Sequence, residues 1–151
     1  VYLSIYLLSL AQVLLLRWGS GAASAVAESG SGHAIVLDGA AEGGGKNRGM
    51  RPLELMALSV GSCSSYDVVS ILKKARQQIS GCEAIVTAER VDAVPAVFES
   101  IHLLFKVTGK GLSEKQVERA VELSADKYCS ASRMLEKTAQ ITHDFEIVDT
   151  A

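Results

Sequence analysis

The fold of this 151-residue chain is decided by residues 51–80, RPLELMALSVGSCSSYDVVSILKKARQQIS. Pro52 suits the first turn of a helix, and the residues from Leu55 to Val60 are almost all apolar. The later part is amphipathic and is followed by Gly81, a helix-ending residue. A helix over residues 53–80 would be about 42 Å long, so it either crosses the core of a dimer or breaks. We place any break at 61–65, where small and hydroxyl residues weaken a helix.

The composition around this helix is that of a globular domain. Hydrophobic residues make up 48% of the chain and charged residues 21%, which excludes a disordered or low-complexity protein. The length fits one domain with its own core. Lys and Arg number 15 against 17 Asp and Glu, and the basic residues are scattered. We therefore expect no nucleic-acid partner, since no surface for tracking phosphates is indicated.

The first residues of the chain resemble a secretory leader in part. Residues 1–16 are apolar except for two Ser and one Gln, and Ala-Ser-Ala follows at 23–25. However, no basic residue precedes the apolar run, whereas Arg17 follows it directly, which reverses the usual order. The run is also short for a membrane span, so we expect no membrane partner. We predict a first strand over 13–18. We also predict that 1–12 form an N-terminal extension and that 13–151 form a single domain.

The remaining pattern alternates short strands with helices. A short strand over residues 34–37 lies between two stretches rich in Gly and Ser, 19–32 and 39–49, which indicate flexible turns. Ser113 and Gln116 form the pattern of a capping box at a helix start. The other expected elements are an antiparallel strand pair at 83–91 and 97–108, a helix to about 127, a shorter helix over 130–138 and a last strand over 141–147. This order predicts an α+β fold.

Three cysteines are the residues most able to carry chemistry. Their small and odd number indicates a reducing compartment, so we expect a cytoplasmic protein. No CxxC, HxxH or HExxH pair is present, so we expect no metal or cofactor; a metal site would need distant single residues. Cys63 and Cys129 lie where a helix is interrupted or begins, and backbone N–H groups there favour a reactive thiolate. The alternative is that each packs as an inert small apolar side chain, as we expect for Cys82.

Asp67 lies four residues after Cys63 and would share its face of the helix. A carboxylate in that place raises the pKa of a thiol, because it opposes a second negative charge.

Two stretches give the chain a family resemblance. The first runs from Arg51-Pro52-Leu53-Glu54-Leu55 through Gly61-Ser62-Cys63 to Tyr66-Asp67-Val68-Val69, and the second is Lys127-Tyr128-Cys129-Ser130-Ala131-Ser132. With these motifs the chain resembles the OsmC/Ohr family, and its YhfA-like branch above all. The resemblance implies an OsmC-like α+β fold, in which antiparallel sheets surround a long buried central helix. It also implies an intertwined homodimer.

The same resemblance implies a thiol-dependent peroxidase that reduces organic hydroperoxides in oxidative stress defence. Cys63 would be the reactive cysteine and Cys129 the resolving one, and an external dithiol would reduce the resulting disulfide. Two other functions stay open. One is a non-enzymatic protein that binds a small apolar ligand at the dimer interface, and the other is a regulatory disulfide switch without turnover.

The resemblance also carries two charged residues into the candidate catalytic set, Glu54 and Arg51. In the Ohr enzymes a Glu directly follows the helix-start Pro, whereas Glu54 comes one residue later, a rotation of about 100° on a helix. Their Gly-Arg-x-Gly turn corresponds to 29–32 here, Ser-Gly-Ser-Gly, which has no Arg. A replacement cation could come from Arg51, Arg48, Arg17 or Arg133. Alternatively, Arg51 and Glu54 form an exposed charge pair at the helix start.

Overall fold

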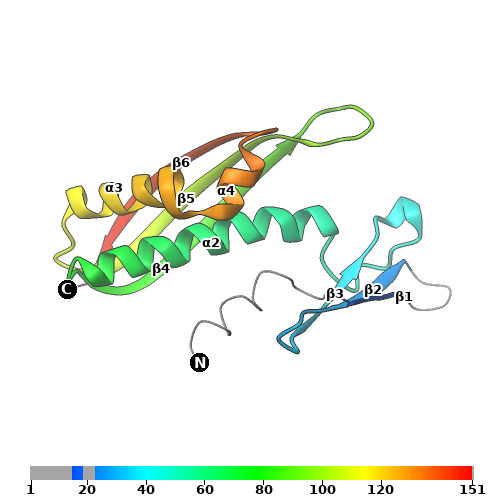
Figure 1. Ribbon diagram of the computed structural model, residues 1–151, viewed down its shortest axis with the longest axis horizontal. Helices are drawn as coiled ribbons and strands as arrows, with labels where there is room; N and C mark the ends of the chain where they lie inside the picture. Colours follow the sequence, from blue (N-terminus) through cyan, green and yellow to red (C-terminus); the bar gives the residue numbers. More distant parts are fainter. Residues whose placement is uncertain (1–14, 19–22, 151) are drawn as a thin grey trace, which may run out of the picture. The chain divides into compact units, whose positions relative to one another are not determined.

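The computed structural model describes residues 15–18 and 23–150 (Figure 1). Their contacts divide the chain into two compact units, one ending at Leu55 and the other beginning at Met56. The N-terminal extension expected over 1–12 lies outside the described residues.

The first unit holds a three-stranded antiparallel sheet. Its strands are β1 (Leu15–Trp18), β2 (Ser24–Glu28) and β3 (Ala34–Asp38), in the order β1-β2-β3. β1 and β3 confirm the strands predicted at 13–18 and 34–37, within the described part of the first. The prediction of turns throughout 19–32 is wrong, because β2 lies within that stretch. Its small residues have weak strand propensity, and pairing with neighbours on both sides stabilises it.

Asp38 organises the glycine-rich loop that follows β3 and contains the short 3-10 helix η1 (Ala41–Gly43). Its carboxylate is 2% exposed and accepts hydrogen bonds from the backbone N–H of Gly39 at 2.8 Å, Lys46 at 3.0 Å and Arg48 at 2.8 Å. The hydrogen bond from the Arg48 N–H has the largest effect and lowers the pKa of Asp38. Burial raises this pKa, but the bonds from Arg48, Lys46 and Gly39 together outweigh burial, so the pKa lies below its ordinary value. The turn predicted at 39–49 is therefore present, and three of its backbone N–H groups bond to the Asp38 carboxylate.

Helix α2 (Pro52–Lys74) is continuous through 61–65, so the alternative of a break is excluded. Its buried residues lie along one face of the helix: Val60, Gly61, Ser64, Val68 and Leu72. Gly61 permits close packing on the neighbouring sheet, since a Cβ there would lie 2.5 Å from Val86 Cγ2. By length and mean hydropathy (1.4) α2 would also suit a membrane span, as core helices of globular proteins often do.

The helix ends six residues before the predicted end. Arg76 adopts a left-handed conformation, with φ of 58°, and the chain turns directly into β4 (Gln78–Arg90). The resemblance implies a long buried central helix, but the first half of α2 is not fully buried within one chain. Met56 is 43% exposed and Leu58 is 50% exposed.

The second unit is built on the sheet β4-β5-β6, with β5 (Phe98–Lys110) between β4 and β6 (Gln140–Asp149). β4 and β5 pair antiparallel as predicted, whereas β6 pairs with β5 in parallel. The antiparallel pairing implied by the resemblance therefore holds for β4 and β5, and the β5–β6 pair departs from it. A helical segment joins β5 to β6 and returns the chain to the starting end of β5. Among the described residues, the central strand contributes more buried apolar side chains than any other element, with alternate residues Ile101, Leu103, Phe105 and Val107 buried.

The connecting segment consists of α3 (Glu114–Leu123), one π-helical turn η2 (Ser124–Tyr128) and α4 (Ser130–Leu135). Figure 1 shows this segment beside α2 over the sheet. Ser113 does precede the first helix, but the predicted capping box is wrong. The Ser113 side chain makes no capping bond, and its backbone N–H donates to Gln77 Oε1 at 2.9 Å. The helix predicted to about 127 is present, but its last turn is the π-helical turn η2, which continues to Tyr128. α4 ends at Leu135, three residues before the predicted end at 138.

Candidate functional site

The two cysteines singled out by the sequence meet where α2 packs against the junction of η2 and α4. The Sγ atoms of Cys63 and Cys129 and a carboxylate oxygen of Asp67 all lie within 4.8 Å of one another. Cys63 and Asp67 are one turn apart on α2, whereas Cys129 is 66 residues further along the chain than Cys63. All three cysteines of the chain are free thiols. The fold thus builds one dithiol and carboxylate cluster inside a single chain.

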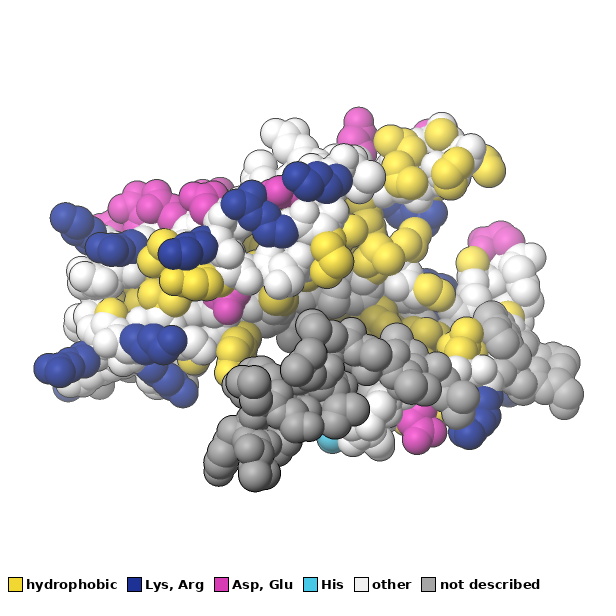
Figure 2. Space-filling view, in the orientation of Figure 1, with side chains coloured by type: hydrophobic (Ala, Val, Ile, Leu, Met, Phe, Trp, Pro, Cys, Tyr) yellow, Lys and Arg dark blue, Asp and Glu magenta, His cyan; other side chains and the backbone are white. Residues whose placement is uncertain are grey.

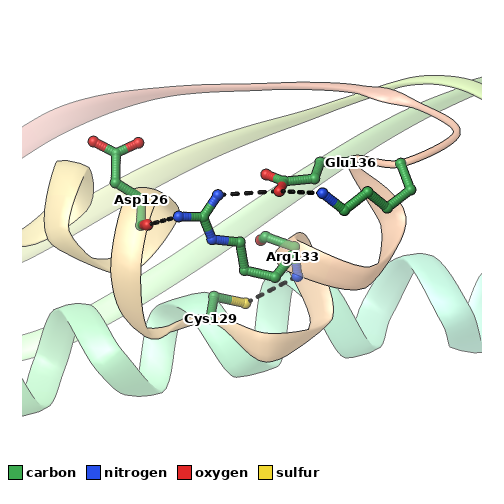
Figure 3. Close-up of polar contacts among 6 residues, drawn as sticks. Asp126, Cys129, Arg133 and Glu136 are labelled. Atoms are coloured by element: carbon green, nitrogen blue, oxygen red, sulfur yellow. Dashed lines mark hydrogen bonds and ion pairs between the residues drawn. The ribbon is translucent and has the colours of Figure 1, made fainter.

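Cys129 is completely buried and is the N-cap residue of α4. Its Sγ accepts hydrogen bonds from Ser64 Oγ at 3.1 Å and from the Ser132 backbone N–H at 3.4 Å, the second of which is drawn in Figure 3. Burial raises the pKa of Cys129, but the donors on Ser132 and Ser64 outweigh burial, so the pKa lies below its ordinary value. Of the two sulfurs, that of Cys129 is therefore the one whose surroundings stabilise a thiolate.

Cys63 is only half-buried, so its sulfur is the more accessible of the two. Burial raises the pKa of Cys63, and the nearby Cys129 and Asp67 raise it further, against a lowering by the Ala131 backbone N–H. The pair loses its first proton mainly from Cys129, and the Cys63 S–H faces the resulting thiolate. The sequence predicted a thiolate-favouring setting for both cysteines, and the structure provides it for Cys129.

Asp67 is the third member of the cluster. Its Oδ2 atom is buried and has no hydrogen-bond partner among the residues that the structure describes. Burial of the carboxyl group raises the pKa of Asp67 above its ordinary value. Ser124 Oγ donates its one hydrogen to the Ser64 carbonyl at 3.2 Å. The sequence placed Asp67 on the Cys63 face of the helix but could not show that its carboxylate would be left without a donor.

A pocket of about 260 Å³ opens beside the cluster, with Asp67 in its wall. Its other lining residues are Ser70, Ile71, Lys74, Leu123 and Tyr128. The apolar side chains offer a surface for a hydrocarbon group, and Lys74 brings a positive charge to the same wall. Because the lining comes from α2 and from the α3–η2 segment, sequence spacing alone did not reveal the pocket.

Arg133 lies close in sequence to Cys129, but its guanidinium is engaged elsewhere. It donates to Glu136 Oε1 at 3.0 Å and to the backbone carbonyl of Asp126. Figure 3 shows the guanidinium held between these two groups, on the side away from the Cys129 sulfur. Arg133 thus links the π turn to α4, and its guanidinium bonds to Glu136 and Asp126 and not to a cysteine sulfur.

Arg51 and Glu54 form a local structure at the start of α2. Glu54 Oε2 accepts a hydrogen bond from the Arg51 backbone N–H at 2.8 Å, and Arg51 Nη1 donates to the Gly49 carbonyl at 3.2 Å. Glu54 thereby caps one of the unpaired N–H groups of the helix start. The charge pair considered between the two side chains is not formed, because both bond to backbone atoms. Of the other candidate cations, Arg17 Nη1 lies 3.6 Å from Glu28 Oε2.

Comparison with known proteins agrees with this architecture. The family model described as OsmC-like protein matches residues 43–144, which include both cysteines. The chain is 44% identical to Protein YhfA of Escherichia coli strain K12 over 132 residues, which are 87% of this chain and 95% of that protein. A chain solved by structural genomics matches with a TM-score of 0.83 and 41% identity, covering 91% of this chain and 99% of its own.

More distant structures share the fold alone. The organic hydroperoxide resistance protein OhrB of Bacillus subtilis is 17% identical and has a TM-score of 0.61, with 90% of this chain and 98% of that chain covered. A fold like that of this chain therefore occurs in a protein whose name refers to resistance to organic hydroperoxides.

Proposed function

The chain belongs to the family of OsmC-like proteins, and on that premise we propose that it is a thiol-dependent peroxidase for organic hydroperoxides. The observation that carries this proposal is the placement of the Cys63 and Cys129 sulfurs and the Asp67 carboxylate within 4.8 Å of one another. An inert packing role for the cysteines accounts poorly for a buried Cys129 sulfur that accepts two hydrogen bonds.

The first step uses the difference between the two sulfurs. The Cys129 thiolate takes the proton of the Cys63 thiol, and the Cys63 sulfur attacks the terminal oxygen of the hydroperoxide. An S–O bond forms as the O–O bond breaks, so that sulfur is oxidised to a sulfenic acid. The leaving alkoxide takes the proton back from Cys129 and becomes an alcohol, which restores the thiolate. Cys129 thus acts as a general base and then as a general acid in place of the missing family Arg.

The second step closes the disulfide. The Cys129 thiolate attacks the sulfur of the Cys63 sulfenic acid, an S–S bond forms, and hydroxide leaves and is protonated to water. Asp67, whose carboxyl group lies within 4.8 Å of both sulfurs, is placed to pass a proton to this hydroxide. Two successive thiol–disulfide exchanges with an external dithiol return both cysteines to the reduced state.

The pocket beside Asp67 favours organic hydroperoxides over hydrogen peroxide. Ile71 and Leu123 provide apolar contacts within about 260 Å³, enough for the hydrocarbon part of a small substrate. A molecule without such a part would make none of these contacts. We therefore expect the preference to appear in kcat/KM.

The test is the rate of peroxide consumption in a stopped-flow instrument, with cumene hydroperoxide or hydrogen peroxide and dihydrolipoamide as the dithiol. We expect fast turnover that is lost in Cys63→Ser, a single turnover at most in Cys129→Ser, and wild-type turnover in the matched control Cys82→Ser. A wild-type rate no higher than that of the free dithiol would exclude the peroxidase. Full turnover by Cys63→Ser would exclude Cys63 as the nucleophile.

One observation favours the second candidate function, a non-enzymatic protein that binds a small apolar ligand. Glu54 caps its own helix and Arg133 bonds to Glu136, so neither charge is available to assist the thiols in the described arrangement. If the chain shows no turnover but a fluorescent apolar probe binds it and is displaced by fatty acyl compounds, this function replaces the first.

A further inference from the structure

We propose that Cys63, Cys129 and Asp67 also form a binding site for a soft divalent cation, with Zn²⁺ as the natural ligand and Cd²⁺ as its closest probe. The site is assembled from single residues of α2 and of the η2–α4 junction, so no metal-binding motif marks it in the sequence. The proposal concerns binding by the reduced protein and does not rest on peroxidase activity.

The positions of the donor atoms suit such an ion. In a tetrahedral zinc site the Zn–S distance is about 2.3 Å, which places two sulfurs about 3.8 Å apart. The three donor atoms here lie within 4.8 Å of one another, so movements of about 1 Å or less would bring them into coordination. Cys63 and Asp67 are fixed one helical turn apart on the same face of α2, and this rigid spacing limits the movement required.

The chemistry of the donors also suits zinc. Thiolates are strong ligands for Zn²⁺, and a carboxylate oxygen is a common third ligand. Two sulfurs and one oxygen leave a fourth position for water, the pattern of an open site. Asp67 Oδ2 is buried and has no hydrogen-bond donor among the described residues, and a cation would give this oxygen the partner that it lacks.

The surroundings support the three ligands. Ser64 Oγ and the Ser132 N–H orient the Cys129 sulfur, as outer hydrogen bonds do in known metal sites. Asp67, one of the three ligands, also lines the pocket of about 260 Å³ described above. A site with two thiolates, one carboxylate and one divalent ion carries a net charge of about −1, and Lys74 in the pocket wall offsets it.

Metal binding would have a direct consequence for the cysteines. A sulfur lone pair that coordinates zinc is not available to attack an oxygen atom, so zinc and a hydroperoxide would compete for the same atoms. In this consequence alone the inference depends on the proposed function. The metal would then protect the dithiol from oxidation, and release of the metal would restore its reactivity.

The test is a titration of the fully reduced chain with Cd²⁺, followed by the sulfur-to-cadmium charge-transfer band in the ultraviolet. Zn²⁺ affinity is then measured by competition with a chromophoric chelator. We expect one ion per chain, no charge-transfer band in the double variant Cys63→Ser/Cys129→Ser, and unchanged binding in Cys82→Ser. Asp67→Asn keeps both thiols and the shape of the side chain, and we expect it to weaken binding by about tenfold or more.

A control variant separates a ligand from a general electrostatic effect. Asp126→Asn removes the same charge from an exposed position in the neighbouring η2 turn, and we expect no change in affinity. Equal affinity of Asp67→Asn and the wild type would overturn the three-ligand site, as would wild-type binding no stronger than that of the double variant. Because no peroxide is present, a failed titration leaves the peroxidase proposal intact, and an inactive enzyme could still bind the metal.

Discussion

Ser64 lies on the buried face of α2 and gives its hydroxyl hydrogen to the Cys129 sulfur at 3.1 Å. This bond favours the thiolate, so Ser64→Ala should raise the pKa of Cys129 and reduce its thiolate fraction at neutral pH. The measurement is the ultraviolet absorbance of the thiolate against pH, in a Cys63→Ser/Cys82→Ser background with one remaining thiol. Ser65→Ala, whose hydroxyl bonds to the Ser62 carbonyl, is the matched control. An unchanged midpoint in Ser64→Ala would show that this hydrogen bond does not stabilise the thiolate.

Asp38 makes the first unit sensitive to acid. Its pKa in the folded chain lies below the unfolded value, so its contribution to stability is complete above the unfolded pKa and is lost as pH falls through the folded one. We expect Asp38→Asn to remove this pH dependence and to speed hydrogen exchange at the Lys46 and Arg48 amides. If both amides of Asp38→Asn are protected from exchange as strongly as in the wild type, the Asp38 carboxylate does not hold this loop in place. Asp92→Asn, at an exposed position, is the control.

The residues of the site differ in how far the sequence could identify them. Cys63 and Cys129 were recognised from motifs that each lie in one short stretch. Ser64 and Ser132 could not be, because their contacts with Cys129 depend on the rotation of α2 and on the π turn before α4. Glu54 was expected at the site from the family pattern, whereas its hydrogen bond to Arg51 reflects a local helix start.

At the scale of elements, the contact between α2 and β4 depends on Gly61. Alanine is favoured over glycine in a helix by about 1 kcal/mol, but a Cβ at this position would lie 2.5 Å from Val86 Cγ2. We expect Gly61→Ala to lower the free energy of unfolding by about 1–3 kcal/mol through overpacking, measured by urea denaturation. Gly61→Ala should lower the free energy of unfolding less in the Val86→Ala background than in the wild type, because the smaller side chain relieves the clash. If both alanines destabilise additively, the contact is not the cause.

The elements predicted best were those with a strong internal pattern. The alternation at 101–107 marked β5, and the apolar run after Pro52 marked α2. β2 was missed because small residues give no pattern, and its partners β1 and β3 stabilise it. The end of α2 was misplaced because residues 75–80 have helical spacing, whereas Arg76 turns the chain and β4 begins. The parallel pairing of β6 depends on the path of the α3–α4 segment, which no local pattern records.

For the whole molecule, the exposed apolar side chains of α2 bear on assembly. Met56 and Leu58 are each about half exposed, and Figure 2 shows hydrophobic side chains along α2 while charged ones cover α3. We expect a homodimer in solution, with an apparent mass about twice the chain mass of 16.0 kDa by light scattering after size exclusion. Leu58→Lys should shift it to the monomer, and Val94→Lys, at a fully exposed loop position, should not. A monomeric wild type would contradict this expectation.

Because Cys63 and Cys129 lie close together although 66 residues separate them in the sequence, the thermal stability of the protein should depend on its redox state. A disulfide between them would close a loop of that length and reduce the entropy of the unfolded chain, which corresponds to about 4 kcal/mol of added stability. The melting temperature of the oxidised form should therefore exceed that of the reduced form, as calorimetry with and without dithiol would show. Oxidation would therefore stabilise the fold at the same time as it blocks both thiols, and the reduced form, with its thiols available, would be the less stable of the two.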